Sequence, residues 1–132
     1  MDKQLLDNIK NALLPNKNVV FAYLFGSQTK TAQTPLSDVD VAVYLRDNVC
    51  FEEEKLRLLD SLTAHTKTED IDLVVLNTAS ISLAGRILHS RIVLIDRKPP
   101  VRHKYESLIM RKSFDFFAFE SAILNRRYKI GR

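Results

Sequence analysis

Hydrophobic and polar positions divide the chain into segments that predict strands and helices in alternation. The apolar run 19–25 is rich in β-branched and aromatic residues, which is typical of a buried strand. Residues 38–45 carry valine at every second position, the pattern of a strand with one buried face. Near the N-terminus, Leu5, Ile9 and Leu13 recur at helical spacing. The chain therefore mixes both kinds of element throughout its length.

Capping residues and apolar stripes place the remaining elements. Asp2 is a suitable N-cap for a helix that ends near Leu14, and three glutamates from Glu52 suit the first turn of another helix. The other predicted elements are a short helix from about Ser27, strands 71–76 and 92–95, a helix from Thr78 or Ser80 to Leu88, and a long amphipathic helix from Pro99 to about Arg127. Helices that alternate with strands predict an α/β (α+β) fold with a small sheet flanked by helices.

The length of 132 residues is enough for one domain with its own core. We expect a single domain over 1–132, with a core at 1–96 and a C-terminal helical segment at 97–132. About a dozen residues connect the first two predicted strands, and the pairing of these strands could be parallel or antiparallel.

Composition narrows the class of protein. Hydrophobic residues make up 45% of the chain and charged residues 27%, as in ordinary globular proteins. No apolar stretch approaches the roughly 20 residues that a membrane span needs, and the N-terminus lacks the apolar segment of a signal peptide. A single cysteine excludes an internal disulfide. These features together predict a cytoplasmic protein without a membrane segment.

Charge is distributed unevenly along the chain. Residues 97–132 contain 10 Lys and Arg against 3 Asp and Glu, whereas residues 1–96 contain 10 against 13. A basic tail on a slightly acidic body suggests an anionic partner, which could be RNA or an acidic protein surface. A solvated helix face would give the same pattern.

The clearest candidate chemistry follows the first predicted strand. That strand ends at Gly26–Ser27, and Asp38 and Asp40 follow ten residues later, separated by one valine. Because side chains alternate along a strand, both carboxylates would project from one face. Two like charges side by side are costly unless a cation lies between them, and Mg²⁺ is the natural candidate because it favours carboxylate oxygens and accompanies phosphates.

Further residues could complete such a site. Asp72 lies in the third predicted strand and could add a carboxylate ligand or accept a proton, and Asp70 has the same strand parity and could take its place. Gly26 would let the backbone approach a phosphate and Ser27 would add a hydroxyl, although a plain turn at Gly26 explains the glycine equally well. No P-loop is present, which disfavours kinases and ATPases of that type.

Gly-Ser followed after ten residues by Asp-x-Asp resembles the signature of the DNA polymerase β-type nucleotidyltransferase superfamily. The short chain is similar to its minimal branch, the MNT-domain proteins, over roughly residues 1–96. The resemblance implies a nucleotidyltransferase fold with a mixed sheet. It also implies catalytic and metal-binding roles for Asp38, Asp40 and Asp72, one or two Mg²⁺ ions, and ATP as the substrate.

MNT-domain proteins are typically encoded beside HEPN-domain toxins and act as their antitoxins. The resemblance therefore implies an adenylyltransferase that moves AMP from ATP to a hydroxyl, expected to be that of a tyrosine, on a partner HEPN toxin in a hetero-oligomer. Two alternatives remain open from the residues alone. The protein could neutralise a toxin by binding without catalysis, or it could modify a small molecule, although a second domain usually builds the pocket for such acceptors.

Overall fold

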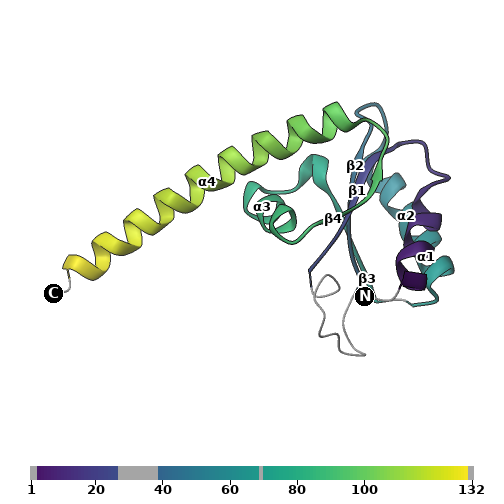
Figure 1. Cartoon of the computed structure of the whole chain (residues 1–132), viewed down its shortest axis with the longest axis horizontal. Coiled ribbons are helices and arrows are strands. Elements are labelled where there is room, and N and C mark those ends of the chain that lie inside the picture. The colour runs from purple at the N-terminus through teal and green to yellow at the C-terminus, as the bar shows by residue number, and fades with distance from the viewer. Residues whose placement is uncertain (1–2, 27–38, 69, 131–132) are drawn as a thin grey trace.

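The structure is a computed structural model that describes residues 3–26, 39–68 and 70–130, with side chains described up to residue 114. A four-stranded sheet in the order β3-β2-β1-β4 forms its centre (Figure 1). Strand β1 (Val19–Phe25) pairs antiparallel with β2 (Val39–Leu45) and with β4 (Ile92–Asp96), and β2 pairs parallel with β3 (Ile71–Val75). The predicted mixed sheet is confirmed, and its first two strands are antiparallel.

Helices cover both faces of this sheet (Figure 1). Helices α1 (Lys3–Leu13) and α2 (Phe51–Thr66) pack on one face, and α3 (Ile81–His89) and the first part of α4 (Pro99–Ile130) pack on the other. A 3₁₀ turn, η2 (Leu76–Thr78), links β3 to α3. Ser80 is the N-cap of α3, as one of the two predicted alternatives had it. The short helix predicted from about Ser27 lies outside the described residues.

The alternation in β2 separates the two sides of the molecule. The four residues predicted to fill one face are all buried against α1 and α2: Val39, Val41, Val43 and Leu45. The intervening residues Ala42 and Tyr44 belong to the cluster under α3 and α4. Asp40 has the same parity as Ala42, so the period of two along the strand directs it toward the α3 face.

Helix α4 is the long C-terminal helix that the sequence predicts, and it extends well beyond the sheet (Figure 1). Ile109 is buried on the α3 side of the sheet, whereas Leu108 is 41% exposed and Phe114 is 73% exposed. Apolar side chains of this helix are therefore only partly covered by the rest of the domain. No helix in the described part of the chain is long and apolar enough to cross a membrane.

Candidate active site

The sheet register places Asp40 and Asp72 opposite each other on the parallel strands β2 and β3. Opposed residues of neighbouring parallel strands project from the same face, which here is the face covered by α3. Val74, two residues beyond Asp72, packs in the same cluster as Ala42 of β2. Asp40 is half-buried and Asp72 is exposed. Two of the three predicted carboxylates are therefore neighbours on adjoining strands.

Gly26 lies at the same end of the sheet, immediately after strand β1. It directly follows Phe25, which is opposite Asp40 in the β1–β2 register. Its φ of +79° lies in the left-handed region that glycine adopts without strain. A Cβ at this position would lie 2.3 Å from Oδ2 of Asp40. The glycine therefore suits both the positive φ of the turn and the close approach of an Asp40 carboxylate oxygen, which a Cβ would displace.

Ser90, which the sequence did not single out, contacts this turn. The Gly26 amide donates a hydrogen bond to Ser90 Oγ at 3.3 Å. Backbone pairing between β1 and β4 ends at Leu24 and Ile92. The hydrogen bond from Gly26 to the Ser90 hydroxyl joins the same two segments of chain just beyond this last pair. Since the Gly26 amide is directed toward Ser90, phosphate contact through that particular N–H becomes a weaker part of the sequence-based hypothesis. No local motif marks Ser90, because it lies 64 residues from Gly26.

Two predicted site residues, Ser27 and Asp38, lie outside the described residues. Within the described ranges, no group of three His, Cys, Asp or Glu side chains is placed to hold a metal ion. The donor chemistry nevertheless fits Mg²⁺, because Asp40 and Asp72 offer carboxylate oxygens from adjoining strands. A predicted third carboxylate, Asp38, precedes β2 by one residue. These three residues would hold the ion.

The alternative ligand Asp70 has a different position. It is exposed and lies just before β3, and its backbone oxygen accepts a hydrogen bond of 2.9 Å from the Val39 amide. In the register of the two strands, it is Asp72 that is opposite Asp40. The geometry therefore favours Asp72 over Asp70 as the partner of Asp40.

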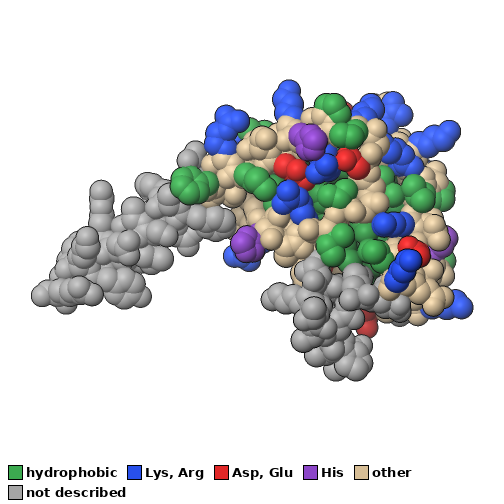
Figure 2. Space-filling view, in the orientation of Figure 1, with side chains coloured by type: hydrophobic (Ala, Val, Ile, Leu, Met, Phe, Trp, Pro, Cys, Tyr) green, Lys and Arg blue, Asp and Glu red, His purple; other side chains and the backbone are tan. Residues whose placement is uncertain are grey.

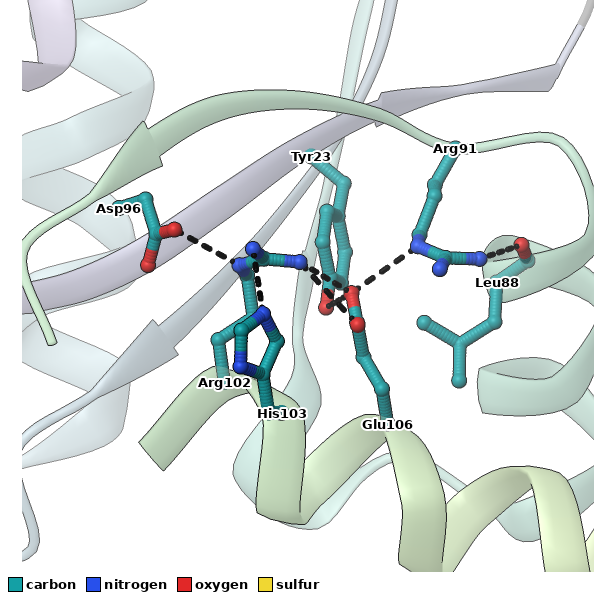
Figure 3. A network of polar contacts seen from close by, with 7 residues as sticks. All are labelled: Tyr23, Leu88, Arg91, Asp96, Arg102, His103 and Glu106. Carbon is teal, nitrogen blue, oxygen red and sulfur yellow. Dashed lines mark hydrogen bonds and ion pairs between the residues drawn. The ribbon is translucent and has the colours of Figure 1, made fainter. Parts of the chain in front are cut away.

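A buried polar network holds α4 against the sheet (Figure 3). Glu106 of α4 accepts hydrogen bonds from Tyr23 Oη at 2.7 Å, Arg91 Nε at 2.9 Å and Arg102 Nη1 at 3.0 Å. Arg102 also donates to Asp96 at the end of β4. Tyr23 precedes Gly26 by three residues in β1, and Arg91 follows Ser90. The network thus connects α4 with both segments that meet at the turn.

The electrostatics of this network follow from its burial and pairing. Burial, reinforced by the hydrogen bond to Glu106, raises the pKa of Tyr23. For Glu106, burial alone would raise the pKa, but the hydrogen bonds from Tyr23 and Arg102 and the charges of Arg91 and Arg102 lower it overall. Tyr23 is therefore a neutral donor and Glu106 an ionised acceptor, which is a structural role rather than an acid–base one.

The surface around α3 and α4 is mixed in character. Lys and Arg side chains are spread over the face in Figure 2, with hydrophobic side chains and acidic groups among them. Met110 and Phe114 of α4 are 45% and 73% exposed. Six of the ten Lys and Arg residues of segment 97–132 lie at or before residue 112, and the other four lie beyond residue 114, outside the described side chains.

Comparison with known proteins identifies the family of the chain. The sequence profile of the family Polymerase beta, Nucleotidyltransferase matches residues 7–100. No curated protein sequence matches the chain at a significant level.

Solved structures resemble the chain over nearly its whole length. A crystal structure of a mutant of the toxin–antitoxin pair MntA–HpeT contains a chain with a TM-score of 0.75 at 22% identity, covering 93% of this chain and 98% of that one. A structure of the tri-AMPylated Shewanella oneidensis HEPN toxin in complex with MNT antitoxin gives a TM-score of 0.71 at 21% identity, with coverage of 97% and 99%. A toxin–antitoxin structure with AMP-PNP gives 0.67 at 24% identity, with coverage of 93% and 98%. At these identities the likeness establishes a shared fold.

Proposed function

The chain belongs to the polymerase beta nucleotidyltransferase family, and on that premise we propose that it is a Mg²⁺-dependent adenylyltransferase that modifies a partner HEPN toxin and acts as its antitoxin. The observation that supports this most is the opposition of Asp40 and Asp72 beside the Gly26 turn. One structurally similar complex contains an AMPylated HEPN toxin, and another contains AMP-PNP. The proposed assembly is therefore a hetero-oligomer of this chain with a HEPN-domain protein.

In the proposed reaction, an acceptor hydroxyl attacks the α-phosphorus of ATP. The new O–P bond forms as the bond to the bridging oxygen of the β-phosphate breaks, and pyrophosphate leaves with the electron pair. Bound Mg²⁺ would neutralise the triphosphate and stabilise the attacking and leaving oxygens. The protein contributes by holding Asp40 and Asp72 on rigid strands, which fixes the site more firmly than a loop would.

The proton of the acceptor also needs a destination. A tyrosine hydroxyl has an ordinary pKa of about 10, so it is mostly protonated at neutral pH. Asp72 is the exposed member of the opposed pair and is accessible to a group that another protein presents. We assign Asp72 the role of accepting this proton, together with its place among the metal ligands.

Position-specific labelling tests the reaction type. The protein, Mg²⁺ and the HEPN-domain protein encoded next to its gene would be incubated with ATP labelled at the α-phosphate and, separately, at the γ-phosphate. Transfer of only the α-label to the partner supports AMP transfer, whereas transfer of the γ-label would indicate a kinase. Asp40→Asn should abolish the transfer, while Asp70→Asn should preserve it. No label on the partner in either case would overturn the proposal.

A second candidate function is neutralisation by binding alone, and the exposure of Met110 and Phe114 on α4 favours it. Large apolar side chains on a helix that extends beyond the sheet are suited to contact with a partner. This function predicts that Asp40→Asn neutralises the toxin as well as the wild type does. The adenylyltransferase proposal predicts that Asp40→Asn fails to neutralise when the two proteins are present at equal, limiting concentrations.

A further inference from the structure

A groove of about 460 Å³ runs along the outer edge of β3. Four consecutive strand residues, 72–75, form its floor. The start of α2 forms one wall with Phe51 and Lys55, and η2 and α3 form the other with Thr78 and Leu83. Because consecutive residues of one strand line it, the groove follows the backbone edge of the sheet rather than one face. Asp72 belongs to this groove and to the candidate active site.

Along this edge, β3 has backbone N–H and C=O groups that pair with no other strand among the described residues. The Val39 amide of β2 donates a hydrogen bond to the backbone oxygen of Asp70, so this oxygen points toward β2. Backbone groups alternate along a strand, so the N–H and C=O groups of Ile71 and Leu73 point to the outer edge. No described strand pairs with β3 on that side. Such an edge is a template for an added strand.

The order of the strands places the groove beyond Asp72, on the side of the carboxylate pair away from the Gly26 turn. Across the sheet, Gly26 at the end of β1 is followed by Asp40 on β2, Asp72 on β3 and then the groove. In-line displacement requires the attacking oxygen and the leaving pyrophosphate on opposite sides of the α-phosphorus. With the triphosphate at the Gly26 side, the attacking hydroxyl would enter from the groove.

We propose that this groove is the acceptor site, and that it binds an extended segment of the acceptor protein as an added strand on β3. This inference rests on the proposed function. A residue directly opposite Asp72 on the added strand would have its Cβ about 4.5–5.5 Å from that of Asp72, on the same face. A hydroxyl side chain at that position would lie beside the Asp72 carboxylate, to which we assign the role of accepting its proton.

The walls of the groove indicate which neighbouring residues the segment would carry. Residues on either side of the hydroxyl would point to the opposite face, toward Phe51 and the exposed Glu52 and Lys55 of α2. With Asp72, the charged groups of the lining comprise two carboxylates and one ammonium group. Asp72 is assigned to the metal ion and the charges of Glu52 and Lys55 balance each other, so the groove favours a segment with an apolar residue next to the modified hydroxyl, against Phe51.

A pair of matched variants tests this site. Glu52 and Glu53 are adjacent, exposed and in the first turn of α2, but only Glu52 is among the groove residues. Glu52→Trp should raise the KM for the HEPN-domain partner by about tenfold or more, with the KM for ATP unchanged, whereas Glu53→Trp should resemble the wild type. Thr78→Trp, from the opposite wall, should reproduce the effect of Glu52→Trp. Melting curves would confirm that all three variants fold.

The outcomes separate this inference from the proposed function. Absence of transfer by the wild type would overturn both. Transfer by the wild type with equal KM values for Glu52→Trp and Glu53→Trp would overturn the groove assignment alone. A rise in the KM for ATP, with the partner KM unchanged, would assign the groove to the nucleotide and also overturn the inference.

Discussion

The carboxylate of Asp40 occupies space that a side chain on Gly26 would need. A Cβ on Gly26 would lie 2.3 Å from Oδ2 of Asp40, well inside van der Waals contact. The two residues are adjacent across the β1–β2 pair, because Phe25 is opposite Asp40. The glycine turn and the carboxylate therefore form one structural unit, and a change to either should alter the other.

Gly26→Ala should damage activity more than stability. The added methyl group must displace Asp40, and the positive φ adds strain of about 2 kcal/mol to the folded state. A displaced carboxylate should lower kcat by about 100-fold. Gly85→Ala in α3, where φ is not positive, serves as the control and should keep full activity. Normal kcat in Gly26→Ala would show that the position of Asp40 does not matter for the reaction.

Ser90→Ala should lower activity through the glycine turn. The substitution removes the hydroxyl that accepts from the Gly26 amide, so the turn loses one restraint on its position. We expect kcat to fall by about tenfold with the KM for ATP nearly unchanged, and Ser90→Thr to restore it.

Ser80→Ala provides the comparison for this effect. Ser80 caps α3 by accepting from the Leu83 amide, and its loss should cost about 1 kcal/mol of stability with kcat preserved. If Ser90→Ala and Ser80→Ala changed stability and kcat in the same way, Ser90 would have only a structural role.

Asp40→Asn and Asp72→Asn should each weaken binding of a divalent ion without unfolding the protein. Mn²⁺ titration followed by electron paramagnetic resonance, in the presence of a non-hydrolysable ATP analogue, should show affinity lowered by more than about tenfold. Asp72 is exposed, so its substitution should change stability by less than about 0.5 kcal/mol. Asp70→Asn should bind the ion as the wild type does. A large loss of affinity in Asp70→Asn but not in Asp72→Asn would exchange their roles.

The Glu106 network should make stability depend on pH in the acidic range. Its hydrogen bonds and the charges of two arginines lower the pKa of Glu106 below the ordinary value of 4.5. The stability that this carboxylate contributes is therefore fully present above that value and is lost as the pH falls through the lower folded-state pKa. Melting temperature measured against pH should fall more steeply in the wild type than in Glu106→Gln.

At neutral pH, Glu106→Gln should itself be destabilised by about 3 kcal/mol, because Arg91 and Arg102 lose their buried partner. Glu53→Gln, at an exposed position, serves as the control and should destabilise the protein much less than Glu106→Gln does. Parallel pH curves for the wild type and Glu106→Gln would contradict the assigned ionisation.

Local patterns were sufficient to predict most of the fold. Alternating valines identified the buried face of β2, and the apolar run identified the central strand β1. The period of two also predicted that Asp40 faces away from those valines. These features are encoded within a few residues, so they can be recognised without knowledge of the tertiary structure.

Long-range contacts were not predictable in the same way. The sequence named Asp72 as a third carboxylate, with Asp70 as an alternative, but only the register of the two strands shows that Asp72 is the one opposite Asp40. The contact of Gly26 with Ser90 depends on how β4 packs beside β1. The Glu106 network joins residues up to 83 positions apart. No short motif encodes such contacts, because each arises only when separate elements have packed together.

The intact mass of the HEPN-domain partner tests the central claim most directly. The partner would be incubated with ATP, Mg²⁺ and either the wild-type chain or the Asp40→Asn/Asp72→Asn double variant, and then weighed by mass spectrometry. We predict that the wild type raises the partner mass by one or more whole AMP units and that the double variant leaves it unchanged. An unmodified partner with the folded wild type, or equal modification by both, would contradict an active site built on Asp40 and Asp72.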